Sequence, residues 1–238
     1  MDKIKKIKIV LGFAYCIIVL LFLWYFFKNF SLEEMSSYEF IKNNRDLIIN
    51  FKQNNFLFVI SIFFIFSIIW VLMLGFGIPV ALLGGFIFGK WLGTIIVSVS
   101  LTVGATLLYI FANFFLKELI REKFGERFIF LKDKFKKNEF IYFFIYRFIG
   151  GIPFFLANII PTLFDIKIKN YFFGSLLGMI PGLFVINSLG SGLEKIIDQN
   201  LMAPNFFELI SNEEIYIPIT VFLFLILITF FLRKKIKS

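Results

Sequence analysis

Five stretches of this sequence carry no charged residue, and they constrain the fold more than any other feature. They run over residues 9–27, 53–89, 91–116, 171–193 and 215–232. A helix needs about 20 apolar residues to cross the roughly 30 Å hydrocarbon core of a bilayer, and each stretch is near or above that length. Only 17% of the chain is charged, against about 25% in soluble domains. The sequence therefore predicts an all-α polytopic membrane protein.

The first stretch has two readings. Like the apolar part of a signal peptide, it follows several lysines. It is longer than the usual run of about 7–15 residues and ends at Lys28 without a small-residue cleavage site. We therefore expect an uncleaved transmembrane anchor. The single cysteine, Cys16, lies inside it, so an intrachain disulfide is excluded.

The polar segments between the stretches set the expected topology. Basic residues dominate the N-terminal tail, residues 117–139 and the C-terminal tail, which places these segments in the cytoplasm. Residues 28–55 are balanced and residues 193–214 are acidic, so we place both outside. Full crossings are then expected over residues 9–27, 91–116, 171–192 and 215–232.

Two apolar segments are left over, and we predict that each forms a re-entrant hairpin. If residues 53–89 or 140–165 crossed completely, the basic segment 117–139 would lie outside. Each segment contains residues that turn a chain, since glycine permits positive φ and proline ends a helix. These are Gly75, Gly77 and Pro79 in the first segment, and Gly150, Gly151 and Pro153 in the second. Irregular backbone at membrane depth must be buried in protein or line a wet cavity, so the two tips should face each other or a shared cavity.

A weak internal repeat relates the two hairpins. The tripeptide Gly-Ile-Pro occurs at residues 77–79 and again at 151–153, and at equal spacing a glycine follows each, Gly104 and Gly178. One hairpin is expected to enter from outside and the other from inside. The two units are therefore predicted to be inverted repeats, the arrangement of many transporters.

Two polar segments are predicted to be interfacial helices. Within residues 118–137, apolar residues recur at helical spacing among basic ones, which indicates an amphipathic helix on the inner leaflet. On the outer side, Ser31 with Glu34 and Ser36 with Glu39 resemble capping boxes that open a helix.

Arg147 is the one unambiguous ionisable residue inside an apolar stretch. A charge there costs at least about 2.5–3.5 kcal/mol on insertion scales. Its guanidinium suits an anionic phosphate headgroup. Alternatively, it binds carbonyls at the hairpin tip or pairs with Asp165, and the sequence leaves these roles open.

The prolines of the two hairpins have two readings. If Pro79 and Pro153 open helices, two helix N-termini with partial positive charge lie deep in the membrane and favour phosphate; otherwise they only break helices. Two glycine series at a spacing of four predict close helix packing. They comprise Gly85, Gly89 and Gly93, and Gly174, Gly178 and Gly182.

Taken in order, these motifs resemble the DedA / SNARE-associated Golgi protein superfamily, whose membrane domain is the VTT domain. The likeness covers roughly residues 56–192 and rests on the sequence of residues 77–89, on Arg147, and on the glycines between residues 174 and 192. It is closer to the Golgi-type branch, because Pro153 stands where the DedA branch has a second arginine. The first hairpin also lacks the acids of the DedA branch.

The resemblance implies inverted re-entrant hairpins and movement of phospholipids or polyprenyl phosphate carriers between leaflets. We expect residues 1–55 to form an N-terminal anchor and an outer interfacial helix. Residues 56–192 should form the VTT-like core, and residues 193–238 an acidic outer loop with a C-terminal transmembrane helix. The expected headgroup path comprises Arg147, Asn158, Gly77, Pro79, Gly151 and Pro153.

The leading prediction is a scramblase or flippase-like transporter, passive or ion-coupled. A membrane assembly factor or scaffold that binds partners through its glycine faces and the basic interfacial helix is the alternative. We expect no enzyme activity, because the chain has no histidine and shows no nucleophile–base pair, and we expect no cofactor or metal. The expected partners are membrane lipids with anionic headgroups and no nucleic acid, and a homo-oligomer stays open. The expected location is a bacterial inner membrane, with a Golgi or thylakoid membrane as alternatives.

Overall fold

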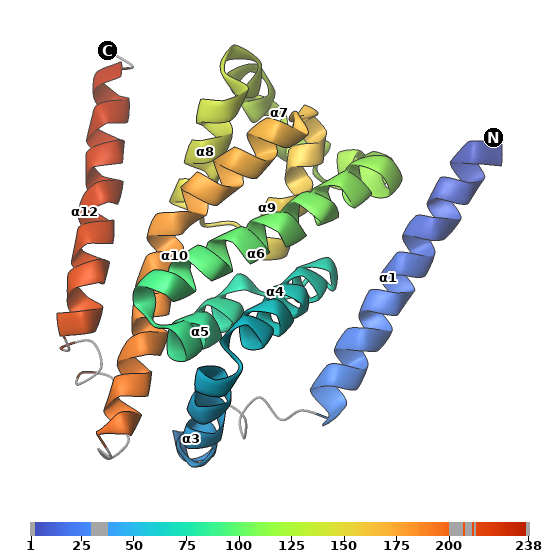
Figure 1. The fold of residues 1–238 in the computed structure, drawn as a ribbon. Coiled ribbons are helices and arrows are strands. Elements are labelled where there is room, and N and C mark those ends of the chain that lie inside the picture. The colour runs from blue at the N-terminus through green and yellow to red at the C-terminus, as the bar shows by residue number, and fades with distance from the viewer. Residues whose placement is uncertain (1–2, 30–37, 200–206, 208–210, 212, 237–238) are drawn as a thin grey trace.

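The computed structural model describes residues 3–29, 38–199, 207, 211 and 213–236, and every regular element in them is a helix (Figure 1). The elements are α1 (Lys3–Asn29), α3 (Tyr38–Asn54), α4 (Phe56–Leu72), α5 (Gly77–Phe88), α6 (Lys90–Phe111), the π-helix η1 (Ala112–Leu116), α7 (Lys117–Lys137), α8 (Glu139–Ile149), α9 (Phe154–Ile159), the 3-10 helix η2 (Ile160–Phe164), α10 (Ile168–Asp198) and α12 (Glu213–Ile236).

The apolar helices make this chain an integral membrane protein. Among the described residues, Lys90–Phe115 and Ile168–Asp198 are long and apolar enough to cross a bilayer. A third candidate is Lys42–Asn54 with Phe56–Leu72, a pair bent by 112°. Helices α1 and α12, with 27 and 24 residues, cover the other two predicted spans. Large apolar side chains lie exposed along α1, α4 and α12, as a lipid-facing surface requires.

In each predicted hairpin, the start and the end of the segment lie close together. At the base of the first, Lys52 Nζ donates a hydrogen bond to the Ile87 carbonyl, with an N–O distance of 2.8 Å. At the base of the second, Glu139 Oε1 accepts hydrogen bonds from the Lys167 backbone N–H at 2.6 Å and from Asn170 Nδ2 at 2.8 Å. The two ends of each apolar segment are therefore held together by hydrogen bonds.

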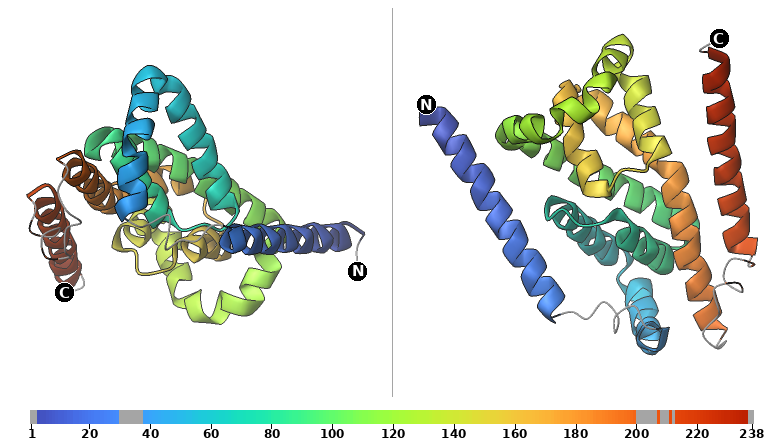
Figure 2. Two further views of the ribbon diagram at one scale, coloured as in Figure 1. Left: turned by 90° about the horizontal axis from the view of Figure 1, so that it is seen from below. Right: turned by 180° about the vertical axis from the view of Figure 1, so that it is seen from behind.

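Charged contacts mark two opposite ends of the molecule. At one end, Arg45 of α3 pairs with Glu194 of α10 at 2.6 Å and also with Asp198. At the other, Lys117 of α7 pairs with Asp165. In both figures the start of α1 and the end of α12 lie at the α7 end, and α3 lies at the other (Figures 1 and 2). Both ends of the described chain therefore lie at the same end of the molecule as α7. Helix α10 runs past residue 192, where the predicted span ends, and its last turns pair with Arg45.

The Arg45–Glu194 pair allows a first prediction. The two side chains are 17% and 21% exposed, so solvent screening keeps their coupling to about 1 kcal/mol or less. A double-mutant cycle with Arg45→Gln and Glu194→Gln, measured as thermal stability in detergent, should give this coupling energy. The coupling energy should disappear in high salt. Asp46→Asn is the control: its side chain is 79% exposed, so its coupling to Arg45 should be near zero. Coupling to Asp46 as large as that to Glu194 would contradict the expected geometry.

The core lies where α6 and α10 cross, with α4 and α5 on one side and α8 on the other. Tyr109 of α6 stacks on Tyr171 of α10 with ring centroids 4.2 Å apart. The two glycines of the sequence repeat lie at equivalent helix contacts. A Cβ on Gly104 of α6 would lie 2.9 Å from Val71 Cβ of α4, and a Cβ on Gly178 of α10 would lie 2.6 Å from Arg147 Cβ of α8. Each glycine therefore lets a long helix approach the first arm of a hairpin.

Five of the six spaced glycines lie at contacts between helices. For each of these five, a Cβ built on the glycine would lie close to an atom of another helix. These atoms are Asn187 O for Gly85 (2.0 Å), Gly84 O for Gly93 (2.6 Å), Phe143 Cδ1 for Gly174 (2.8 Å), Arg147 Cβ for Gly178 (2.6 Å) and Phe222 Cζ for Gly182 (3.8 Å). Gly89 differs, because it is the residue after α5, with φ 79°, and no atom lies within 4 Å of its added Cβ. Its role is to reverse the chain between α5 and α6, where glycine tolerates the left-handed backbone.

Helix α7 confirms the helix predicted over residues 118–137. Its buried Phe135 joins the main hydrophobic core and stacks on Phe164 of η2. Its buried Ile120 packs with Ala112 and Leu116 of η1 in a separate apolar cluster. The proposed capping residues Ser31 and Ser36 lie outside the described residues, and α3 begins at Tyr38.

Candidate functional site

The tip of the first hairpin has its backbone carbonyls paired by aromatic side chains. The Tyr15 hydroxyl of α1 donates a hydrogen bond to the Leu72 carbonyl, and Trp70 Nε1 donates to the Phe76 carbonyl at 2.9 Å. A Cβ on Gly75 would lie 2.2 Å from Trp70 Nε1, so the indole reaches its partner only because residue 75 is glycine. Unpaired backbone groups at membrane depth cost several kcal/mol each, and these two contacts remove that cost.

The tip of the second hairpin is more open. Gly150 and Gly151 adopt φ angles of 66° and 81°, and no atom lies within 4 Å of a Cβ built on either. Glycine is needed there for its backbone freedom and not for space. Pro153 follows as the residue before α9.

The two tips meet, as we expected from the turn residues. A Cβ on Gly77, the first residue of α5, would lie 3.4 Å from the ring of Phe154, the first residue of α9. In the reading in which the prolines open helices, each was expected at the first helical position, and neither lies there. Pro79 is the third residue of α5, and Pro153 directly precedes α9. At both positions a backbone N–H has no acceptor within the helix, so the missing N–H costs nothing.

Arg147 lies close behind the tips, on the last turn of α8, and is 6% exposed. Its Nη2 donates to the Tyr171 hydroxyl at 2.6 Å. The guanidinium carbon lies 5.3 Å from the Phe143 ring centre and 5.2 Å from that of Tyr171, within range of a cation–π contact. Within the described part of the chain, Nε and Nη1 have no hydrogen-bond partner. A buried cation with unused donors is costly, and an anion at this place would remove that cost.

Asn158 joins the same cluster from α9. Its backbone carbonyl accepts a hydrogen bond from the Tyr171 hydroxyl at 3.1 Å. Its side chain is fully buried, and its Oδ1 and Nδ2 lack partners among the described residues. Tyr171 therefore links two residues that the sequence placed on one path. Sequence reasoning missed Tyr171 because nothing in an apolar span distinguishes this tyrosine before its stack on Tyr109 is known.

The proposed ion pair between Arg147 and Asp165 is wrong. Asp165 pairs with Lys117 at the surface. The other proposed partner, a carbonyl at the tip, is replaced by the tyrosine hydroxyl. Arg147 therefore has no carboxylate partner among the described residues.

Removal of the Tyr171 hydroxyl should destabilise the protein. A hydrogen bond to a charged group contributes about 1.5–3 kcal/mol, so we expect Tyr171→Phe to lower the free energy of unfolding by this amount. The effect should shrink when Arg147 is already replaced by methionine, as a double-mutant cycle in detergent would measure. Tyr216→Phe, at an exposed position of α12, is the matched control. Equal effects of Tyr171→Phe with and without Arg147 would contradict the linkage.

Comparison with known families identifies the part of the chain that holds these residues. The VTT domain matches residues 76–192. This segment is 117 of the 238 residues, and over it the chain is similar to a VTT domain. This segment contains α5 with Gly77, the tip of the second hairpin and the Arg147–Tyr171–Asn158 cluster, and it begins four residues after α4 ends.

The chain is also similar to two named proteins. A transmembrane protein 41 homolog of Caenorhabditis elegans is 25% identical over 183 residues, which cover 71% of this chain and 73% of that protein. A transmembrane protein 41 homolog of Dictyostelium discoideum is 23% identical over 163 residues, which cover 66% of this chain and 48% of that protein. Both belong to the Golgi-type branch of the superfamily, so the resemblance to that branch is confirmed. No solved structure matches the chain.

Proposed function

We propose that this protein moves phospholipids or polyprenyl phosphate carriers between the two leaflets of its membrane. The observation that carries the proposal is Arg147, a buried cation with unpaired donors on Nε and Nη1 among the described residues, in the last turn of α8 before the second hairpin tip. A phosphate crossing a bilayer needs a charge partner at depth, because an unpaired charge there is costly. Guanidinium supplies that charge and strong hydrogen bonds to phosphate.

The proposed path runs between the hairpin tips. In this proposal Gly77 with Pro79 of one tip and Gly151 with Pro153 of the other form its entrance. Asn158 is linked to the cation through the Tyr171 hydroxyl. The open space around Gly150 and Gly151 supports access to this place. Transport would be passive or ion-coupled, and no enzyme chemistry is proposed.

We also propose that the hairpins are re-entrant and form inverted repeats. The equivalent contacts of Gly104 with α4 and Gly178 with α8 support this arrangement, as do the hairpin bases held together at Lys52 and Glu139. Transporters built this way hold their site near the bilayer midplane. By the positive-inside rule, α7 and both termini would face the cytoplasm, in a bacterial inner membrane.

The scaffold alternative receives less support. It would use the spaced glycines and the basic helix α7 as faces for other proteins, whereas five of the six spaced glycines contact other helices of this chain. These five glycines therefore lie at contacts among α5, α6, α8, α10 and α12.

Translocation can be tested directly in liposomes. The purified protein would be reconstituted with a headgroup-labelled fluorescent phospholipid, and a membrane-impermeant reductant would be added outside. We expect bleaching to proceed beyond the outer-leaflet half in liposomes that contain the protein, and to stop there in protein-free liposomes. Bleaching that stops at half, with insertion verified by protease protection, would contradict phospholipid translocation. The assay would then be repeated with a labelled polyprenyl phosphate, and failure there too would reject the proposal.

A further inference from the structure

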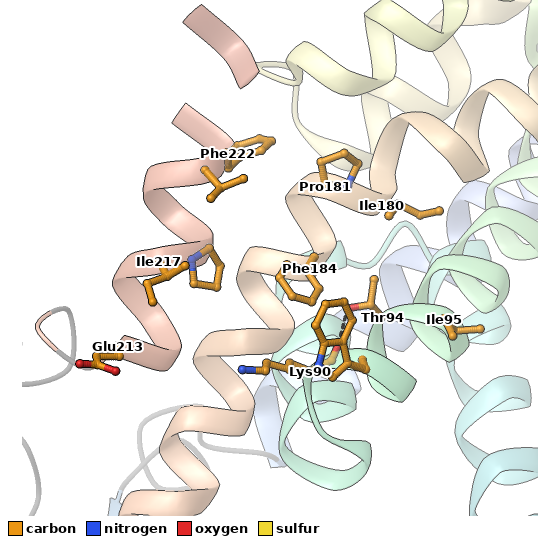
Figure 3. Close-up of a pocket in the computed structure, with 12 residues that line it drawn as sticks. Lys90, Thr94, Ile95, Ile180, Pro181, Phe184, Glu213, Ile217 and Phe222 are labelled. Carbon is orange, nitrogen blue, oxygen red and sulfur yellow. Dashed lines mark hydrogen bonds between the residues drawn. The ribbon is translucent and has the colours of Figure 1, made fainter. Parts of the chain in front are cut away.

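A cleft on the flank of the molecule lies apart from the hairpin tips. It has a volume of about 620 Å³ and lies between the start of α6, the middle of α10 and the first half of α12 (Figure 3). Helix α12 contacts α10 beside it: a Cβ on Gly192 would lie 2.9 Å from Ile215 Cδ1, and one on Gly182 would lie 3.8 Å from Phe222 Cζ. The volume falls in the range of about 300–1,000 Å³ that is typical of ligand sites.

The wall of the cleft is apolar. Its lining includes Ile180, Pro181 and Phe184 of α10 and Ile217 and Val221 of α12. These side chains offer an acyl chain an apolar surface but no hydrogen bonds, so a headgroup could be bound only at an end where the lining is polar.

One end of the cleft carries two opposite charges. Lys90 is the first residue of α6 and Glu213 the first of α12, and Figure 3 shows both at the same end, away from Pro181 and Phe222. This is the end of the molecule that holds α3, so it lies at a membrane boundary. Trp91 lines the cleft next to Lys90 with its ring 4.8 Å from that of Phe184, and tryptophan favours such boundaries.

We infer that the cleft binds one phospholipid with a zwitterionic headgroup that ends in a primary ammonium, such as phosphatidylethanolamine. The acyl chain lies along the apolar wall, Lys90 faces the phosphate, and Glu213 accepts hydrogen bonds from the ammonium. Charge complementarity selects this occupant: an anionic headgroup without an ammonium would place its charge beside Glu213 unpaired. A quaternary ammonium has no N–H to donate to the carboxylate.

Trp91 provides an internal probe for this site. The variant Trp24→Phe keeps Trp91 and Trp70, whereas Trp91→Phe keeps Trp24 and Trp70. Trp70 is buried, while Trp91 and Trp24 are 70% and 61% exposed. Trp24 lies near the end of α1 and so samples lipid on another face. Each variant would be placed in vesicles with acyl-brominated phosphatidylethanolamine, phosphatidylcholine or phosphatidylglycerol at equal mole fractions, and tryptophan quenching measured.

We expect brominated phosphatidylethanolamine to quench Trp91 at a several-fold lower mole fraction than the other two lipids, and Trp24 to be quenched equally by all three. Glu213→Gln, introduced into the Trp24→Phe protein, should abolish the preference over phosphatidylcholine. Lys90→Gln should weaken quenching by all three lipids. Equal quenching of Trp91 by all lipids, a preference for phosphatidylglycerol, or a preference that survives Glu213→Gln would each overturn the inference. So would a Trp91 that no lipid quenches, which would mean that something other than lipid covers the cleft.

This inference does not depend on translocation. The quenching experiment reports equilibrium binding in one leaflet, whereas the liposome assay reports exchange between leaflets. A protein that fails one measurement can therefore still pass the other.

Discussion

Arg147→Gln is expected to slow lipid translocation by roughly 10- to 150-fold. A charge-assisted hydrogen bond contributes about 1.5–3 kcal/mol, and each 1.36 kcal/mol lost from a barrier's stabilisation slows a rate tenfold. Glutamine keeps a donor but removes the charge that the phosphate needs at depth. The rate of fluorescent phospholipid bleaching in liposomes measures the change. Arg147→Lys should fall between glutamine and the wild type, because it restores the charge without the planar guanidinium.

The same variant separates a transport role from a structural one. Loss of the cation removes its hydrogen bond to Tyr171. It also removes the cost of burying Nε and Nη1 without partners among the described residues, so the melting temperature in detergent should change little. Arg121→Gln, at an exposed position of α7, is the control and should leave both rate and stability unchanged. A folded Arg147→Gln protein that translocates at the wild-type rate would remove Arg147 from the path. A protein that no longer folds would assign Arg147 to structure.

Gly85→Ala is expected to lower the melting temperature in detergent by several degrees. The added methyl would lie 2.0 Å from the Asn187 carbonyl oxygen, and backbone cannot rotate away as a side chain can. Overpacking of this kind costs about 1–3 kcal/mol or more, and in a chain of this length each kcal/mol corresponds to about 2–4 °C. Helix α5 would have to move off α10, and the first hairpin tip would move with it.

Gly182→Ala is the matched control, since it makes the same chemical change in a helix with room for it. Its Cβ would lie 3.8 Å from Phe222, an ordinary contact, so the gain in helix propensity of about 1 kcal/mol should leave the protein as stable as the wild type or more so. Equal melting temperatures for Gly85→Ala and Gly182→Ala would show that α5 and α10 do not approach as closely as described.

The all-helical membrane character of the chain followed from charge and hydropathy because these act over whole segments. Placing the basic residues 117–139 on one side left room for two hairpins, and Lys52 and Glu139 hold the bases of those hairpins closed. The exact ends of helices depend on single contacts and were harder to predict. Helix α10 continues to Asp198 because Glu194 and Asp198 pair with Arg45, a residue more than a hundred positions earlier.

The candidate site was predictable only in part. A lone arginine in an apolar segment is a strong signal, because its cost in the membrane demands a compensating role. Its partner Tyr171 and the carbonyl-pairing residues Tyr15 and Trp70 gave no such signal, because tyrosine and tryptophan are ordinary in apolar spans. Their roles depend on which helices meet, and that is set by glycines such as Gly85 and Gly178, whose neighbours are known only from the structure.

The hydrogen bond from Tyr15 to the Leu72 carbonyl extends the folding unit of this protein beyond the segment that matches the VTT domain. Both residues precede the segment 76–192 that matches the VTT domain, as does Val71, against which Gly104 packs. The segment that matches the VTT domain is thus smaller than the segment that must fold together. A fragment cut at residue 76 would expose the surface of α6 against which α4 packs. Helices α1 and α4 therefore belong to the same folding unit as the segment that they contact.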